Sequence, residues 1–89
     1  MHSIELAQPY ISAAELGDVK AQFTLALLYA NAHGGLQKNE KLAYKWASMA
    51  AMNGDSEAAM LVDLLFSQMS RPDLDEARKL IQSCRANKL

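Results

Sequence analysis

The chain has 89 residues, a length that suits one small domain and leaves no room for a second. About half of the residues are apolar, with alanine and leucine dominant, whereas the scarcity of valine and isoleucine disfavours a sheet. Nine basic and ten acidic residues give a formal net charge of -1, so we expect neither nucleic acid nor a membrane as a partner. The single cysteine, Cys84, excludes an internal disulfide, and the N-terminal residues lack a secretory signal pattern, which indicates the cytoplasm.

An internal repeat organises the chain. A shift of 37 residues places Gly17 and Asp18 on Gly54 and Asp55, and it superimposes the leucine pair 27–28 on the pair 64–65. Repeats of this length are typical of stacked helical pairs. We therefore predict one all-α domain over residues 1–89, which divides into a half-repeat 4–17, a first repeat 18–54 and a drifted terminal repeat 55–89.

Five helices are expected, at residues 4–16, 19–32, 40–52, 56–69 and 74–86. Pro9 is tolerated only in the first turn of a helix, so the first helix is expected to begin as late as Gln8. The first helix is apolar around much of its circumference. Its N-terminal edge is a candidate surface for self-association, and the alternative is that these side chains are simply exposed.

Glycine and aspartate mark the turns that precede the second and the fourth expected helix. Gly17 and Gly54 suit the left-handed position just after a helix. Asp18 and Asp55 follow at once and can cap the next helix. Each Gly-Asp pair therefore predicts a tight turn between two antiparallel helices.

Two further breaks come later in the chain. The His-Gly-Gly run at residues 33–35 is expected to end the second helix, and Asn39 is expected to cap the third. The Ser-Arg-Pro run at 70–72 predicts another break, after which Asp73 and Glu76 have the spacing of a capping box.

Residue size predicts how the helices pack. Alanines are expected where backbones approach closely: Ala21, Ala43, Ala50, Ala51 and Ala58. Large side chains are expected to fill the layers between repeats: Leu28, Tyr29, Trp46, Leu65 and Phe66. We also expect Met49 and Met52 in the core and Met60 on the surface, and we expect Asp63 to be partly exposed or hydrogen-bonded.

The last helix has the two faces that a terminal cap requires. Its apolar stripe consists of Leu74, Ala77, Leu80, Ile81 and Cys84. Its polar outer face consists of Asp75, Glu76, Arg78, Lys79, Gln82 and Arg85.

The repeat resembles the Sel-one-like repeat, a solenoid relative of the tetratricopeptide repeat. The residues that carry the resemblance are Ala13, Ala14, Gly17, Ala21, Leu25, Tyr29, Gly34, Gly35, Ala43, Trp46, Ala50, Ala51 and Gly54. The resemblance implies a right-handed α-solenoid of antiparallel helix pairs, although Asp63 stands where the family prefers a small residue. Disulfide-rich members linked with enzyme activity carry cysteine pairs within each repeat, and this chain has none.

Analogy with tetratricopeptide-like solenoids places the binding surface on the first helix of each pair, which lines the concave face. The candidate partner-binding residues are Lys20, Phe23, Leu27, Asn31, Glu57, Met60, Leu64 and Gln68. Their apolar members would form a groove for a partner's helix or extended segment, and their polar members would form its rim. The alternative is that neighbouring helices cover the apolar members.

No catalytic, metal-binding or phosphate-binding pattern stands out. His2 and His33 lack a partner at ligand spacing, and Cys84 is expected to be a small core residue. We therefore expect no cofactor and no enzymatic activity, but an adaptor or scaffold that binds another protein. The alternative is an inhibitor or immunity protein that neutralises a cognate bacterial toxin or enzyme.

Overall fold

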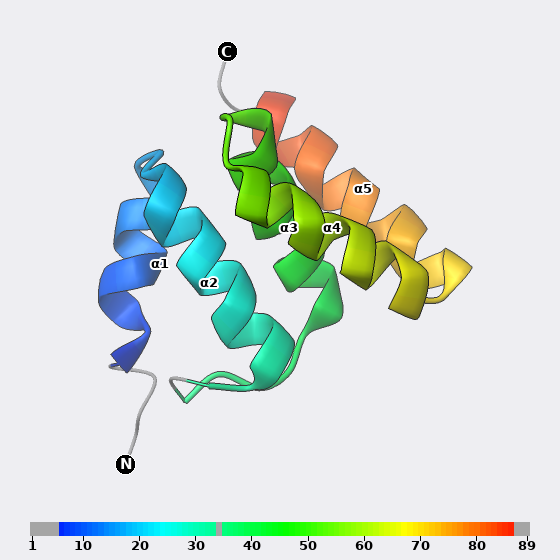
Figure 1. The fold of residues 1–89 in the computed structure, drawn as a ribbon, viewed down its shortest axis with the longest axis horizontal. Coiled ribbons are helices and arrows are strands. Elements are labelled where there is room, and N and C mark those ends of the chain that lie inside the picture. The colour runs from blue at the N-terminus through cyan, green and yellow to red at the C-terminus, as the bar shows by residue number, and fades with distance from the viewer. Residues whose placement is uncertain (1–5, 34, 87–89) are drawn as a thin grey trace.

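The computed structural model describes residues 6–33 and 35–86, of which 84–86 by their backbone alone. Within these ranges the chain forms five helices and no strand, which confirms the predicted all-α class (Figure 1). The helices are α1 (Gln8–Glu15), α2 (Val19–Asn31), α3 (Glu40–Met52), α4 (Ser56–Gln68) and α5 (Arg71–Ala86).

Helix α3 is the centre of the arrangement. It packs against α2, α4 and α5, whereas α1 packs against α2. Figure 1 shows α1 and α2 at one end of the molecule and α5 at the other, with α3 and α4 between them. Among the described residues, no helix has both the length and the apolar character needed to cross a membrane.

Helix α1 begins at Gln8 and holds Pro9 in its first turn, where the missing backbone N–H is not needed. The late start expected from Pro9 is therefore confirmed. Residues 4 and 5 of the expected range lie outside the described residues, as does His2. Helix α1 has no side-chain cap at its N-terminus.

The two Gly-Asp turns have the same geometry 37 residues apart. Gly17 has a φ angle of +100° and Gly54 one of +99°, in the left-handed region that favours glycine. The Oδ1 atoms of Asp18 and Asp55 each accept a hydrogen bond from the backbone N–H three residues further on, both at 2.9 Å. The predicted glycine turns and aspartate caps are confirmed.

Helix α2 stops before the glycines that were expected to end it. Its last residue is Asn31, and Ala32 takes the left-handed conformation with a φ angle of 57°. The N–H of His33 then donates to the Leu28 carbonyl at 2.9 Å, as at other helix ends of this type. The loop leads to Asn39. Its Oδ1 accepts a hydrogen bond from the Leu42 N–H, in the first turn of α3, at 3.0 Å, so the expected cap is confirmed.

Helix α5 begins at Arg71, three residues before the expected start. The prediction that Asp73 caps this helix is wrong. Ser70 is the capping residue, and its Oγ accepts a hydrogen bond from the Asp73 N–H at 3.3 Å. The physical reason is that Pro72 lies in the first turn, where proline fits a helix rather than breaking it.

The buried side chains form two adjacent clusters. The first lies among α1, α2 and α3 and consists of Ala7, Ala14, Ala21, Leu25, Ala26, Leu36, Trp46, Ala47 and Met49. The second lies among α3, α4 and α5 and consists of Ala43, Tyr44, Leu65, Met69, Leu74 and Ala77. Of the five alanines expected at close approaches, Ala51 alone is only half-buried.

Two predicted core residues are exposed. Phe66 is 52% exposed and Met52 is 54% exposed, so their placement in the core is wrong. Helix α4 packs mainly against α3 through the stripe that contains Ala58 and Leu65, and it leaves its other sides open. By contrast, Met49 is buried as expected, and Met60 and Asp63 are exposed as expected.

The terminal helix shows the expected division of its surface. Leu74 and Ala77 are buried and Ile81 is half-buried, whereas Leu80 is 38% exposed at the edge of the stripe. Most of the charged side chains of α5 are exposed: Arg71, Asp75, Glu76, Arg78 and Lys79. The side chain of Cys84 lies outside the described residues.

One buried polar residue was not anticipated. Gln22 is fully buried, and its Nε2 donates to the Ala14 carbonyl at 3.2 Å. This bond joins α2 to the end of α1, so the amide helps to hold these two helices together.

Candidate partner-binding site

A cavity of about 340 Å³ lies between the C-terminal half of α2 and that of α4. The start of α3 and the loop before it close one side. We call this the α2–α4 cavity, and its lining consists of Leu27, Ala30, Asn31, Lys38, Glu40, Leu61, Leu64, Leu65 and Gln68.

Four of the eight predicted partner-binding residues meet in this cavity: Leu27, Asn31, Leu64 and Gln68. They form two pairs at equivalent positions, because Leu64 follows Leu27 by 37 residues and Gln68 follows Asn31 by the same distance. The cavity is therefore lined by two pairs of residues, the members of each pair lying 37 positions apart in the sequence.

The other four predicted residues do not line the cavity: Lys20, Phe23, Glu57 and Met60. They lie nearer the N-terminal ends of α2 and α4. Phe23 is half-buried, whereas Met60 is 71% exposed. The structure thus concentrates the candidate site at one end of the two helices.

The lining divides by chemistry. Its apolar part comes from α2 and α4: Leu27, Ala30, Leu61, Leu64 and Leu65. The polar part comprises the amides of Asn31 and Gln68 and the charges of Lys38 and Glu40. Asn31, Lys38 and Gln68 are exposed and Glu40 is half-buried, so these groups are accessible at the rim.

Repeat analogy missed Lys38 and Glu40 because their position depends on the loop before α3. The Asn39 N–H donates to the Tyr29 carbonyl at 3.0 Å, which holds the end of this loop against α2. The residues on either side of Asn39 are thereby placed beside the cavity. Leu61 and Leu65 could have been found from sequence, since they lie within four residues of Leu64 on the same helix.

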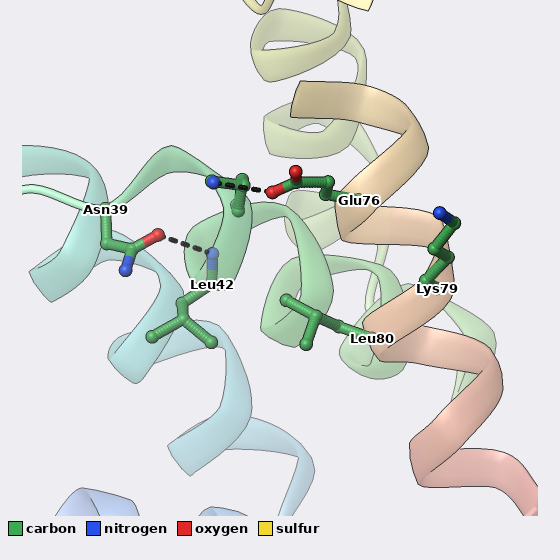
Figure 2. A pocket seen from close by; sticks show the side chains of 6 residues that line it. Asn39, Leu42, Glu76, Lys79 and Leu80 are labelled. Carbon is green, nitrogen blue, oxygen red and sulfur yellow. Dashed lines mark hydrogen bonds and ion pairs between the residues drawn. The ribbon is translucent and has the colours of Figure 1, made fainter. Parts of the chain in front are cut away.

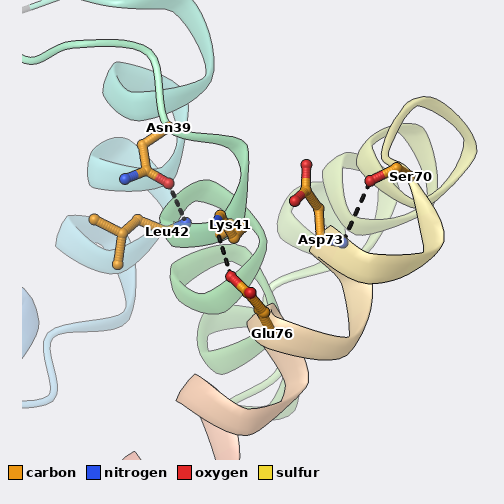
Figure 3. A network of polar contacts seen from close by, with 6 residues as sticks. All are labelled: Asn39, Lys41, Leu42, Ser70, Asp73 and Glu76. Atoms are coloured by element: carbon orange, nitrogen blue, oxygen red, sulfur yellow. Dashed lines mark hydrogen bonds and ion pairs between the residues drawn. The ribbon is translucent and has the colours of Figure 1, made fainter.

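A second hollow, of about 550 Å³, lies between the start of α3 and α5. Figure 2 shows Leu80 extending from α5 toward α3, where Leu42 also lines the hollow. Lys41 and Glu76 bridge the two helices, with Nζ and Oε1 2.7 Å apart (Figure 3). The Asn39 side chain is already engaged in capping α3.

The Lys41–Glu76 pair is the main electrostatic feature of the second hollow. The hydrogen bond from Lys41, with its positive charge, lowers the pKa of the Glu76 carboxyl. The same bond and the Glu76 charge raise the pKa of the Lys41 ammonium. Both side chains are well exposed to water, so this pair stabilises the contact between helices only weakly.

The described residues contain no group of three or more histidine, cysteine, aspartate or glutamate side chains that could hold a metal ion. Comparison of the chain with protein-family models, with curated proteins and with solved structures gave no match.

Proposed function

We propose that this protein is a protein-interaction module, an adaptor or scaffold that binds a segment of a partner polypeptide at the α2–α4 cavity. The observation that supports this most is the convergence of Leu27 and Leu64, with Asn31 and Gln68 beside them, in one accessible concavity. Concave sites that combine apolar side chains with polar groups are the usual form of binding sites.

The volume and chemistry of the cavity indicate how a partner would bind. At about 340 Å³ it suits an anchoring side chain rather than a whole domain. An apolar side chain would contact the leucines. The Asn31 and Gln68 amides, each with both a donor and an acceptor, could then hydrogen-bond the partner's backbone on either side of it.

The resemblance to Sel-one-like repeats is part of this proposal. The recurrence of both Gly-Asp turns 37 residues apart, with the same φ angles and the same caps, supports a helical repeat. In such a solenoid α2 and α4 would be the first helices of consecutive pairs and would line the binding face.

Capture of a partner from source-cell extract tests the proposal when cavity and surface variants are compared. Leu64 and Phe66 are matched for this purpose, because both lie on α4 and both are 52% exposed, whereas only Leu64 lines the cavity. We expect Leu64→Gln to weaken capture by about tenfold or more, and Phe66→Gln to leave it unchanged. Equal loss with both variants, or loss with Phe66→Gln alone, would argue against the cavity.

The inhibitor or immunity protein suggested by the sequence would bind in the same manner. Assay of the captured partner's own activity separates the two functions. An adaptor leaves that activity unchanged, whereas an inhibitor abolishes it, and Leu64→Gln should then restore it.

A further inference from the structure

A third hollow, of about 300 Å³, lies between the C-terminal part of α3 and α4. We call it the α3–α4 hollow. Its lining consists of Ser48, Ala51, Met52, Ala59, Val62 and Asp63. None of these residues lines the α2–α4 cavity, so the two concavities are separate sites.

Most of the lining is apolar and accessible. Ala51 and Val62 are half-buried and Ala59 is exposed, so these side chains form the walls between the two helices. Met52, which was expected in the core, is 54% exposed and lies in the same lining. Its flexible, polarisable thioether can adapt to an apolar group placed beside it. A hydrocarbon chain that entered the hollow would therefore leave water and contact apolar side chains from both helices.

The polar part of the lining consists of Ser48 from α3 and Asp63 from α4. Among the described residues, Asp63 is the only charged one in the lining. Its carboxylate has two acceptor oxygens, and the Ser48 hydroxyl can accept a hydrogen bond as well. The hollow thus combines apolar walls with a group of acceptors and one negative charge.

The described part of the chain does not supply a cation to Asp63. The positions three and four residues away on α4 hold alanine, methionine, phenylalanine and serine, so no lysine or arginine lies at pairing distance along the helix. On α3, Lys45 is the lysine nearest to Ser48 in sequence, but its Nζ lies 4.2 Å from the centroid of the Trp46 ring. The ion pair that the described residues form joins Lys41 to Glu76 instead.

Other structural roles do not account for this aspartate either. Asp63 lies in the middle of α4 and caps no helix, whereas Asp18 and Asp55 each cap one. It belongs to neither cluster of buried side chains. The carboxylate is therefore a free charge beside an apolar hollow.

An arginine side chain combines the two chemistries that the hollow requires. Long basic side chains place their hydrocarbon stem along apolar surface and keep the charged end accessible to water. The guanidinium can donate two parallel hydrogen bonds to a carboxylate and has further N–H groups for a hydroxyl. It is also more weakly hydrated than the ammonium of lysine, so it gives up less hydration on binding.

We propose that the α3–α4 hollow binds an arginine side chain of a partner polypeptide. The stem lies against Met52 and Val62, and the guanidinium pairs with Asp63, with the Ser48 hydroxyl beside it. The single negative charge of the lining favours this occupant over an acidic or an uncharged side chain. The hollow shares no residue with the α2–α4 cavity, so this proposal stands or falls independently of the proposed function.

Titration of the isotopically labelled chain with two peptides, followed by NMR, tests the proposal. The first peptide is acetylated and amidated Ala-Ala-Arg-Ala-Ala. In the second, citrulline replaces arginine, which keeps the stem and the planar end but removes the charge. The arginine peptide should shift the amide resonances around Ser48, Met52 and Asp63 in a saturable manner at about millimolar concentration. The citrulline peptide should bind about fivefold more weakly or less.

Three results with the unchanged chain would overturn the proposal. The first is equal binding of the two peptides, because the charge would then have no role. The second is the absence of a saturable shift in the hollow, or saturable shifts around Leu27 and Leu64 instead. The third is equally tight binding of a lysine peptide of the same length, which would contradict the assignment to arginine.

Variants separate the hollow from the overall charge of the chain. Asp63→Asn keeps the shape of the side chain and removes its charge, so it should weaken the arginine peptide by about fivefold or more and remove its advantage over citrulline. Asp75→Asn, at an exposed position on α5, removes the same charge and is the matched control. It should leave binding unchanged, and far-UV circular dichroism checks the helical content of both variants. Equal losses with the two variants would exclude the hollow as the site.

Discussion

Leu27 of α2 and Leu64 of α4 stand at equivalent positions 37 residues apart, and both line the same cavity. Neither is fully buried: Leu27 is half-buried and Leu64 is 52% exposed. Neither residue belongs to the two buried clusters, so the core does not account for an apolar side chain at this position of either helix. The expected consequences of this arrangement can be measured.

Neighbouring leucines on α4 should differ sharply in their contribution to stability. Leu65 is 2% exposed, so Leu65→Ala should lower the free energy of unfolding by about 2–5 kcal/mol. Leu64→Gln should change it by no more than about 0.5 kcal/mol, as for other surface substitutions. Urea unfolding followed by circular dichroism measures both. A large loss with Leu64→Gln would mean that Leu64 supports the core rather than a partner.

Trp46 should be among the most costly side chains to remove. It is 6% exposed and packs in the cluster among α1, α2 and α3, with the Lys45 Nζ 4.2 Å from its ring centroid. Trp46→Ala should lower the free energy of unfolding by about 3–5 kcal/mol. Phe66→Ala, on an exposed aromatic, is the control and should cost far less. Similar losses for the two variants would contradict the burial described above.

The two aspartate caps should contribute equally. Asp18→Ala and Asp55→Ala each remove the same 2.9 Å hydrogen bond from an equivalent turn, and each should cost about 1 kcal/mol. The caps share no partner, so the double variant should show the sum of the two losses. Chemical denaturation of the three variants tests this. A difference of several-fold between the single variants would contradict the equivalence of the two turns.

The Lys41–Glu76 pair should give stability a small pH dependence. The pKa of Glu76 is lower in the folded chain than its ordinary value of 4.5. The contribution of the pair to the free energy of unfolding is therefore fully present above pH 4.5. It is lost as the pH falls through the folded-state pKa. Lys41 has a raised pKa, so its contribution is present below 10.5 and is lost as the pH rises through its folded-state value.

Thermal unfolding of the Glu76→Gln variant and of the unchanged chain, each followed across acidic pH, measures the contribution of Glu76 to stability. We expect the unchanged chain to be slightly more stable at neutral pH and the difference to vanish at low pH. Asp75→Asn, on an exposed carboxylate that makes no ion pair with a described residue, is the control. A difference that grows on acidification would contradict the sign of the Glu76 shift.

Local chemistry made much of this fold predictable. Asp18, Asp55 and Asn39 each satisfy a backbone N–H three residues away, so their role can be inferred from the nearby sequence alone. Ser70 was missed because Pro72 has two local meanings, a break or a first turn, and the sequence does not distinguish them.

The remaining differences come from neighbours that are distant in sequence. Phe66 aligns with Tyr29, yet Tyr29 is half-buried against both clusters of buried side chains, whereas Phe66 is exposed on α4. The candidate site shows the same division. Leu27 and Leu64 follow from the repeat register, whereas the place of Lys38 depends on how the loop before α3 returns to α2.

The most direct test of the proposed function is to map the bound partner on the chain by NMR. Amide resonances of isotopically labelled protein would be followed as purified partner is added. We expect the largest shifts around Leu27, Asn31, Leu64 and Gln68, with little change around Phe66. Shifts confined to α1 or to the outer side of α4, with the cavity residues unchanged, would contradict binding at the α2–α4 cavity.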